Sequence, residues 1–172
     1  MIVRSEVSEV SVVEGGVPLV YTFGDLMRYH GPSAPGGVAH AFKVLERALP
    51  LLDEGHPIER REVEIATAHG GPGVRDAFEM VTRAVTGGRY VVDPALARPE
   101  RGSTLANYVF RLDYRGSSVT LQVRDGFVAD EFIELVNRSG RTDAEESRLV
   151  VLKQEMTDRL LAVPATEVYD VD

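Results

Sequence analysis

Glycine- and proline-rich turns divide this chain into short segments whose apolar residues recur at either strand or helix spacing. Residues 1–20 mix valine with glutamate and serine and predict one or two short strands, broken at Gly15-Gly16. Thr22 is of a residue type that caps helices, and it predicts a short helix that ends at Gly31. The first part of the chain is therefore expected to pass from strand to helix.

The next segments alternate between the two spacings. Apolar residues at helical spacing predict a helix over residues 38–52, which Pro50 ends or kinks and Gly55 closes. Residues 63–68 alternate as a strand and run directly into a glycine-rich turn. A second apolar stripe after that turn predicts a helix over residues 74–85.

The rest of the chain predicts strands followed by two acidic helices. The expected elements are a strand at residues 89–93, a hairpin over 105–126, helices over 129–137 and 143–161, and an extended segment over 163–172. This order indicates an α+β (α/β-like) fold with a mixed sheet packed by helices. Residues 1–172 are expected to form a single domain, with a strand region at 1–20 and a C-terminal helix and extended tail at 141–172.

Composition excludes several classes of function. The 172 residues suffice for one domain with a core, and 44% of them are apolar. A net charge of −8 and the lack of a basic cluster argue against a nucleic-acid partner. The absence of cysteine excludes disulfides, iron–sulfur clusters, thiolate metal ligands and a cysteine nucleophile. The apolar runs are too short to span a membrane and no signal-peptide pattern is present, so a cytoplasmic protein without a membrane partner is expected.

Three of the four histidines are candidate site residues. His30 ends the first predicted helix, His40 lies near the start of the next, and His69 ends a predicted strand. Neutral imidazoles bind zinc, nickel, copper or iron, and an imidazole also serves as a general acid or base near pH 7. Their spacing matches no recognised metal signature, so ordinary capping or surface histidines are the alternative. His56 is expected to be exposed.

The stretch "HGGPGVRD", residues 69–76, is a candidate anion site. After a strand, Gly70, Gly71 and Gly73 allow backbone N–H groups to point at an anion, and a following helix N-terminus favours negative charge. Arg75 lies close by in the sequence. The stretch is neither a dinucleotide-binding nor a P-loop signature, so a tight turn without a ligand is the alternative.

Polar side chains beside these motifs offer further candidates. Ser33 lies in no G-x-S-x-G elbow and follows no strand, so it is not favoured as a nucleophile. Tyr29 is expected to pack its ring into the core with its hydroxyl at the rim of a pocket. Asp76 and Glu79 can orient a histidine or ligate a metal, although acids near a helix start also simply stabilise the helix dipole.

Residues 22–52, "TFGDLMRYHGPSAPGGVAHAFKVLERALPLL", resemble the opening of the FmdE-like family, which takes its name from a component of formylmethanofuran dehydrogenase. In that family a turn of aromatic-His-Gly-His-x-Cys-Pro-Gly separates a short helix from a long one. Residues 68–88, "AHGGPGVRDAFEMVTRAVTGG", are similar to its second turn, and residues 160–172 are similar to its closing segment. The resemblance spans roughly residues 20–172.

The resemblance implies the fold, a homodimer and a small-molecule pocket between the two turns, with His30 and His69 facing one cleft. The chain departs from the family where Pro32 and Ala34 replace its second turn histidine and its cysteine. The cysteine of the second turn and the cysteine-rich zinc-binding tail are also absent. A thiolate metal site therefore cannot exist, and a divalent metal would rest on His30 and His69, with His40 as a further candidate ligand.

These observations predict a small-molecule enzyme that uses metal-assisted or acid–base catalysis on a small anionic metabolite, with His30 and His69 as catalytic residues. The expected ligand-binding residues are Tyr29, Ser33, Gly70, Gly71, Gly73 and Arg75. The alternatives are a non-catalytic metal- or ligand-binding accessory domain and a structural or oligomeric protein with a degenerate site. The apolar stripe of residues 143–161 belongs to the core and can also contribute to a dimer.

Overall fold

In the computed structural model, which describes residues 7–172, β1 (Glu9–Glu14) and β2 (Val17–Thr22) form an antiparallel hairpin. Gly15 and Gly16 make its turn, with φ angles of 56° and 82° that favour glycine. The predicted break between two short strands is confirmed. Residues 1–6 of the predicted strand region lie outside the described residues.

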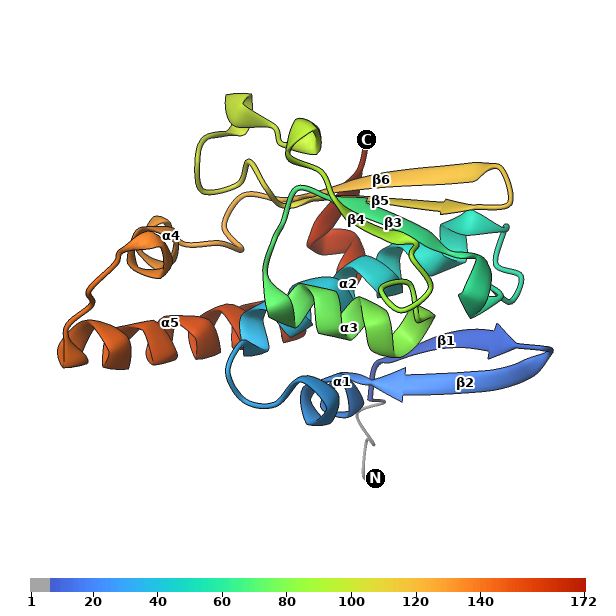
Figure 1. Ribbon diagram of the computed structural model, residues 1–172, viewed down its shortest axis with the longest axis horizontal. Coiled ribbons are helices and arrows are strands. Elements are labelled where there is room, and N and C mark those ends of the chain that lie inside the picture. The colour runs from blue at the N-terminus through green and yellow to red at the C-terminus, as the bar shows by residue number, and fades with distance from the viewer. Residues whose placement is uncertain (1–6) are drawn as a thin grey trace, which may run out of the picture.

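A five-stranded sheet forms the second β layer (Figure 1). Its strands are β3 (Glu64–Thr67), β4 (Tyr90–Val92), β5 (Val109–Tyr114), β6 (Ser117–Val123) and β7 (Tyr169–Val171). They lie in the spatial order β4-β3-β5-β6-β7, with β3 and β4 parallel and all other neighbours antiparallel. The predicted α+β fold with a mixed sheet is therefore confirmed, and β5 and β6 form the predicted hairpin.

The central helix of the fold is α2 (Pro35–Leu52), which contacts both the sheet and three other helices. Those helices are α1 (Phe23–His30), α3 (Pro72–Thr82) and α5 (Asp143–Leu161). In Figure 1, α2 and α3 lie on one side of the sheet, and α1 and the β1–β2 hairpin lie beyond them. The stripe of apolar residues predicted for α2 is buried, including Val38, Phe42 and Leu45.

A helical arm extends from the sheet at the left of Figure 1 and consists of α4 (Asp130–Asn137) and the first half of α5. Leu135 of α4 packs against Leu149 and Leu152 of α5 in a cluster separate from the main core. The predicted helix over residues 143–161 is confirmed, and a capping box formed by Thr142 and Glu145 sets its start. Within residues 7–172, no helix is long and apolar enough to cross a bilayer.

The predicted end of α2 at residue 52 is confirmed, but α2 begins at Pro35 and not at residue 38. Pro50 does not end α2, because a proline in the last turn removes one hydrogen bond while the burial of Leu49 and Leu52 holds that turn in place. Helix α3 ends before the predicted residue 85. Arg83 adopts a left-handed conformation with φ of 57° and its N–H donates to the Glu79 carbonyl, which terminates the helix.

Candidate active site

A cavity of about 510 Å³ opens where α2 and α3 begin, with α4 and α5 forming its opposite wall. Its walls differ in character. The turns before the two helices and the first turns of those helices contribute small and polar residues, namely Ser33, Gly37, His69, Gly70, Gly71 and Gly73. Helices α4 and α5 contribute mainly apolar side chains together with one cation, namely Phe132, Ile133, Val136, Met156 and Lys153. A ligand with both a polar and an apolar part fits such a cavity.

The turn between β3 and α3 fixes His69 in the cavity wall. The Thr67 hydroxyl accepts from the His69 backbone N–H at 3.0 Å and donates to the Val109 carbonyl, which ties the turn to the sheet. The Gly71 N–H donates to His69 Nδ1 at 3.0 Å. Because Nδ1 is thereby an acceptor, the proton of the neutral ring lies on Nε2. The ring therefore presents a hydrogen-bond donor to a ligand.

Burial keeps this ring neutral. His69 packs against Tyr108 with ring centroids 4.8 Å apart, and burial lowers the pKa of His69 to about 4. His40 lies deeper, with its Nδ1 hydrogen-bonded to the Tyr169 hydroxyl at 2.8 Å. Burial, and secondarily the nearby His69 and Arg159, lower the pKa of His40 to about 3. Both rings are uncharged at neutral pH, and His40 does not border the cavity.

The starts of α2 and α3 converge beside His69. Both helices begin with proline followed by glycine, and neither has a side-chain cap. A Cβ on Gly73 would lie 2.8 Å from the Ala34 carbonyl oxygen, so only glycine allows the two helix starts to approach so closely. Lys153 adds a positive charge, with its Nζ donating to the Ser33 carbonyl at 2.9 Å. Although the chain is acidic, this wall of the cavity favours an anion.

His30 joins Ser33 to Asp76 through hydrogen bonds. His30 Nδ1 lies 2.8 Å from Asp76 Oδ2, and His30 Nε2 lies 3.3 Å from Ser33 Oγ. A carboxylate only accepts hydrogen bonds, so Nδ1 donates to Asp76 and Nε2 accepts from the Ser33 hydroxyl. The His30 side chain is 4% exposed, whereas Ser33 borders the cavity. His30 therefore reaches the cavity through the Ser33 hydroxyl.

Two of the predicted ligand-binding residues do not border this cavity. Tyr29 is 52% exposed, so the prediction that its ring packs into the core is wrong. The inward face of α1 carries Leu26 and His30, and helical geometry turns Tyr29 away from that face. Arg75 also points away from the cavity and lies 3.3 Å from Asp76 in an ion pair.

The histidines do not gather as a three-ligand metal centre. Within residues 7–172, no group of three or more histidine, aspartate or glutamate side chains is placed to hold a metal ion. His30 uses both ring nitrogens in hydrogen bonds, and His69 accepts the Gly71 N–H at Nδ1. The divalent metal implied for His30, His69 and His40 stays a prediction.

Sequence reasoning did not identify three contributors to the site. Tyr108 supports His69, Lys153 brings the cation, and the apolar wall comes from α4. These residues lie far from both turns in the sequence, and no local pattern connects them. Asp76 is one of the two acids expected to orient a histidine, and the structure places its carboxylate on His30.

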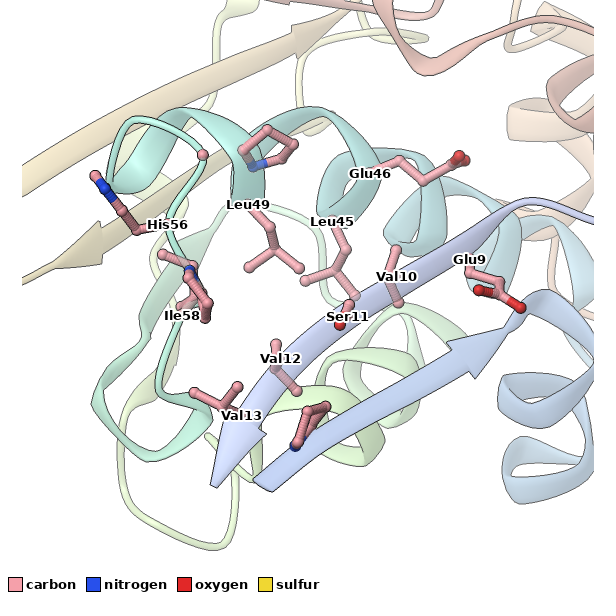
Figure 2. Close-up of a pocket in the computed structure, with 14 residues that line it drawn as sticks. Glu9, Val10, Ser11, Val12, Val13, Leu45, Glu46, Leu49, His56 and Ile58 are labelled. Carbon is pink, nitrogen blue, oxygen red and sulfur yellow. The ribbon is translucent and has the colours of Figure 1, made fainter. Parts of the chain in front are cut away.

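A second cavity, of about 400 Å³, lies between β1 and the C-terminal half of α2 (Figure 2). Its walls are largely apolar, with Val10, Val12 and Leu45 among the side chains shown. His56 lies at this cavity and is exposed, as expected, with its Nδ1 hydrogen-bonded to the Asp53 backbone carbonyl. The first cavity is the better candidate, because Ser33 in its wall is hydrogen-bonded to a histidine that is paired with a carboxylate, whereas none of the described residues that line the second cavity has such a partner.

Neither a protein-family model nor a curated protein matches this sequence. The resemblance to the FmdE-like family stays a prediction.

Proposed function

We propose that this chain is an enzyme that acts on a small anionic molecule in the cavity between the starts of α2 and α3, by acid–base catalysis. The observation that carries the proposal is the hydrogen-bonded series Ser33–His30–Asp76, which ends at the cavity wall. A histidine held by a carboxylate on one nitrogen is oriented to exchange a proton at the other. The Asp76 carboxylate also stabilises the imidazolium that forms when His30 accepts a proton.

Binding of the substrate rests on the other groups in the wall. The neutral His69 ring offers its Nε2–H, the uncapped helix starts offer backbone N–H groups, and Lys153 offers positive charge. The apolar side chains of Phe132, Ile133 and Met156 suit a hydrocarbon portion of the same molecule.

The alternative is a ligand-binding domain without catalysis. The low pKa of His69 favours it, because a ring that stays neutral donates a hydrogen bond without exchanging protons near pH 7. This alternative assigns the same anion site but no chemical role to His30. The FmdE-like fold, a homodimer and a cytoplasmic location belong to the same proposal, and the pocket that the resemblance implies lies between the same two turns.

Thermal shift measurements with small carboxylates and inorganic phosphate test the anion site. Gly71→Ala is the informative variant, because a Cβ there would lie 2.5 Å from His69 Cε1 and displace the ring. Gly70→Ala is its control, because a Cβ there meets nothing within 4 Å. We expect an anion to raise the melting temperature of the wild type and of Gly70→Ala, and to raise that of Gly71→Ala much less.

An anion response that is equal in all three proteins, or absent from the wild type, would contradict the proposal. Retention of anion binding without turnover of any ester, amide or phosphate substrate would favour the non-catalytic alternative.

Elemental analysis of the same samples tests the metal prediction. Stoichiometric zinc, nickel, copper or iron that is lost in both His30→Ala and His69→Ala would support it.

A further inference from the structure

On the basis of the proposed function, we infer that Ser33 is a nucleophile and that the cavity hydrolyses a carboxylic ester of a small anionic molecule through an acyl-serine intermediate. Three groups carry this inference. Asp76 accepts from His30 Nδ1 at 2.8 Å, and His30 Nε2 faces Ser33 Oγ at 3.3 Å. A hydroxyl, an imidazole and a carboxylate in this order activate a serine on many unrelated folds, where geometry rather than sequence order identifies them.

The distance from Ser33 Oγ to His30 Nε2, 3.3 Å, is at the long end for a hydrogen bond. Catalytic hydrogen bonds often tighten only when substrate binds. Ser33 lies in the turn between α1 and α2, and α3 supplies Asp76 from a different part of the chain. The end of α1, the turn after it and α3 therefore supply His30, Ser33 and Asp76, respectively. The alignment of the three side chains depends on how these elements pack in the tertiary fold.

Exposure differs along the series in the way that this role requires. Ser33 is exposed and borders the cavity, whereas the His30 side chain is 4% exposed. A substrate in the cavity meets the hydroxyl first, and the base behind it is shielded from bulk water. Shielding strengthens the electrostatic coupling between the imidazolium and the Asp76 carboxylate.

Hydrogen-bond donors and a positive charge lie beside Ser33. The first turn of α2 begins at Pro35, directly after the turn that holds Ser33, and its backbone N–H groups have no side-chain cap. The Lys153 ammonium lies 2.9 Å from the carbonyl oxygen of Ser33 itself. Hydrogen-bond donors and charge beside the nucleophile stabilise the tetrahedral intermediate of acyl transfer.

The apolar wall formed by α4 and α5 indicates the class of acyl group. Phe132, Ile133, Val136 and Met156 provide an apolar surface opposite the turns, and the cavity volume of about 510 Å³ accommodates a small molecule. We assign the apolar acyl chain to this surface and the anionic part of the ester to the wall that contains His69.

The reaction proceeds in two steps. Ser33 Oγ attacks the ester carbonyl carbon while its proton moves to His30 Nε2, and the carbon–oxygen bond to the leaving alcohol breaks as that alcohol takes the proton. Water then attacks the acyl-serine and gives a proton to His30, which returns it to Ser33 Oγ as the acid leaves. One ester and one water yield one carboxylic acid and one alcohol, and no other reactant is needed.

Labelling with an alkyl fluorophosphonate tests the nucleophile, followed by intact mass and peptide mapping. We expect one adduct per chain on Ser33 in the wild type, no adduct in Ser33→Ala, and a labelling rate about 10²-fold lower in Asp76→Asn and His30→Ala. Ser117→Ala, which changes an exposed serine at the start of β6, should label as the wild type does. Absence of an adduct, an adduct elsewhere, or equal rates in wild type and His30→Ala would overturn the inference.

A second variant guards against loss of structure on removing His30. Because the chain has no cysteine, Ser33→Cys introduces the only thiol. We expect iodoacetamide to alkylate it at pH 7 at least about tenfold faster than it alkylates Ser117→Cys, because the imidazole promotes the thiolate. Equal rates would overturn the inference.

If labelling fails while anions still raise the melting temperature in a manner that depends on Gly71, only the nucleophile is wrong. If the anion response fails as well, the proposed function falls with it.

Discussion

At the scale of single residues, His69 in the cavity wall and His40 behind it are costly to protonate. His40 and His69 both pack against Tyr108, and burial lowers their pKa values to about 3 and about 4. In an unfolded chain a histidine titrates near pH 6.5. Between these values the unfolded chain binds more protons than the folded one, so the free energy of unfolding falls as the pH drops below about 6.5.

His40→Gln tests this difference. As the pH falls from 6 to 4, the free energy of unfolding should decrease more steeply in the wild type than in His40→Gln. The two slopes should differ by up to about 1.4 kcal/mol per pH unit, because the variant lacks one titrating group. Denaturant unfolding at several pH values measures the slope. The matched control is His56→Gln, since His56 is exposed in the folded chain. If the free energy of unfolding of His40→Gln depends on pH as steeply as that of the wild type, burial of His40 does not lower its pKa as argued.

Local sequence patterns predict some of these residues and not others. His69 and its glycines follow a strand in a contiguous stretch, so their place at a turn could be predicted from the sequence alone. The role of Asp76 depends on the packing of α1 against α3, which no local spacing encodes. The prediction for Tyr29 is wrong because an eight-residue helix with several apolar residues leaves its inward face ambiguous until its neighbours are known.

At the scale of elements, α4 is held more weakly than the helices of the core. Its one buried residue is Leu135, which packs in the small cluster with Leu149 and Leu152 of α5. Helix α2, in contrast, is buried along most of its length. Elements with few buried apolar contacts open locally at lower free energy than the whole molecule. Since α4 supplies part of the apolar wall, its opening exposes the cavity.

Leu135→Ala should loosen α4 without unfolding the core. We expect faster hydrogen exchange at the amides of α4, and a smaller loss of global unfolding free energy than the roughly 2–5 kcal/mol that is typical of a buried Leu→Ala change. Leu45→Ala, in the middle of α2, is the comparison and should show a loss in that range. Hydrogen exchange monitored by mass spectrometry separates the two cases. Equal and global effects of both variants would show that α4 folds as part of the core.

The elements themselves follow from short-range periodicity, which is why most helices and strands could be predicted. The order of strands in the sheet could not, because β7 at the C-terminus pairs with β6 and β3 lies between β4 and β5. The continuation of α2 through Pro50 depends on burial, and the early end of α3 at Arg83 depends on a left-handed backbone conformation. Both are properties of the folded chain.

At the scale of the whole molecule, the arm of α4 and α5 presents apolar side chains to solvent. Val150 and Val151 of α5 are 66% and 46% exposed, and Val136 of α4 is 41% exposed. Val150 and Val151 lie outside the buried positions of α5, which include Leu149, so the predicted core assignment holds for only part of the apolar stripe of that helix. Exposed apolar residues gathered on a projecting element are typical of a surface that pairs with another copy.

The predicted homodimer can therefore be tested on this arm. We expect light scattering after size exclusion to give twice the chain mass of 18.9 kDa for the wild type and a lower mass for Val150→Glu, because a carboxylate at a two-fold interface is repeated and desolvated. Val91→Glu is the matched control, since Val91 of β4 is also 54% exposed but lies outside the arm. It should leave the mass unchanged.

A monomeric wild type would refute the dimer. A dimer that survives Val150→Glu but not Val91→Glu would move the interface to the edge of the sheet. Because α4 and α5 also form one wall of the cavity, dissociation of a true dimer should weaken the anion response as well, and this would link the oligomeric state to the site.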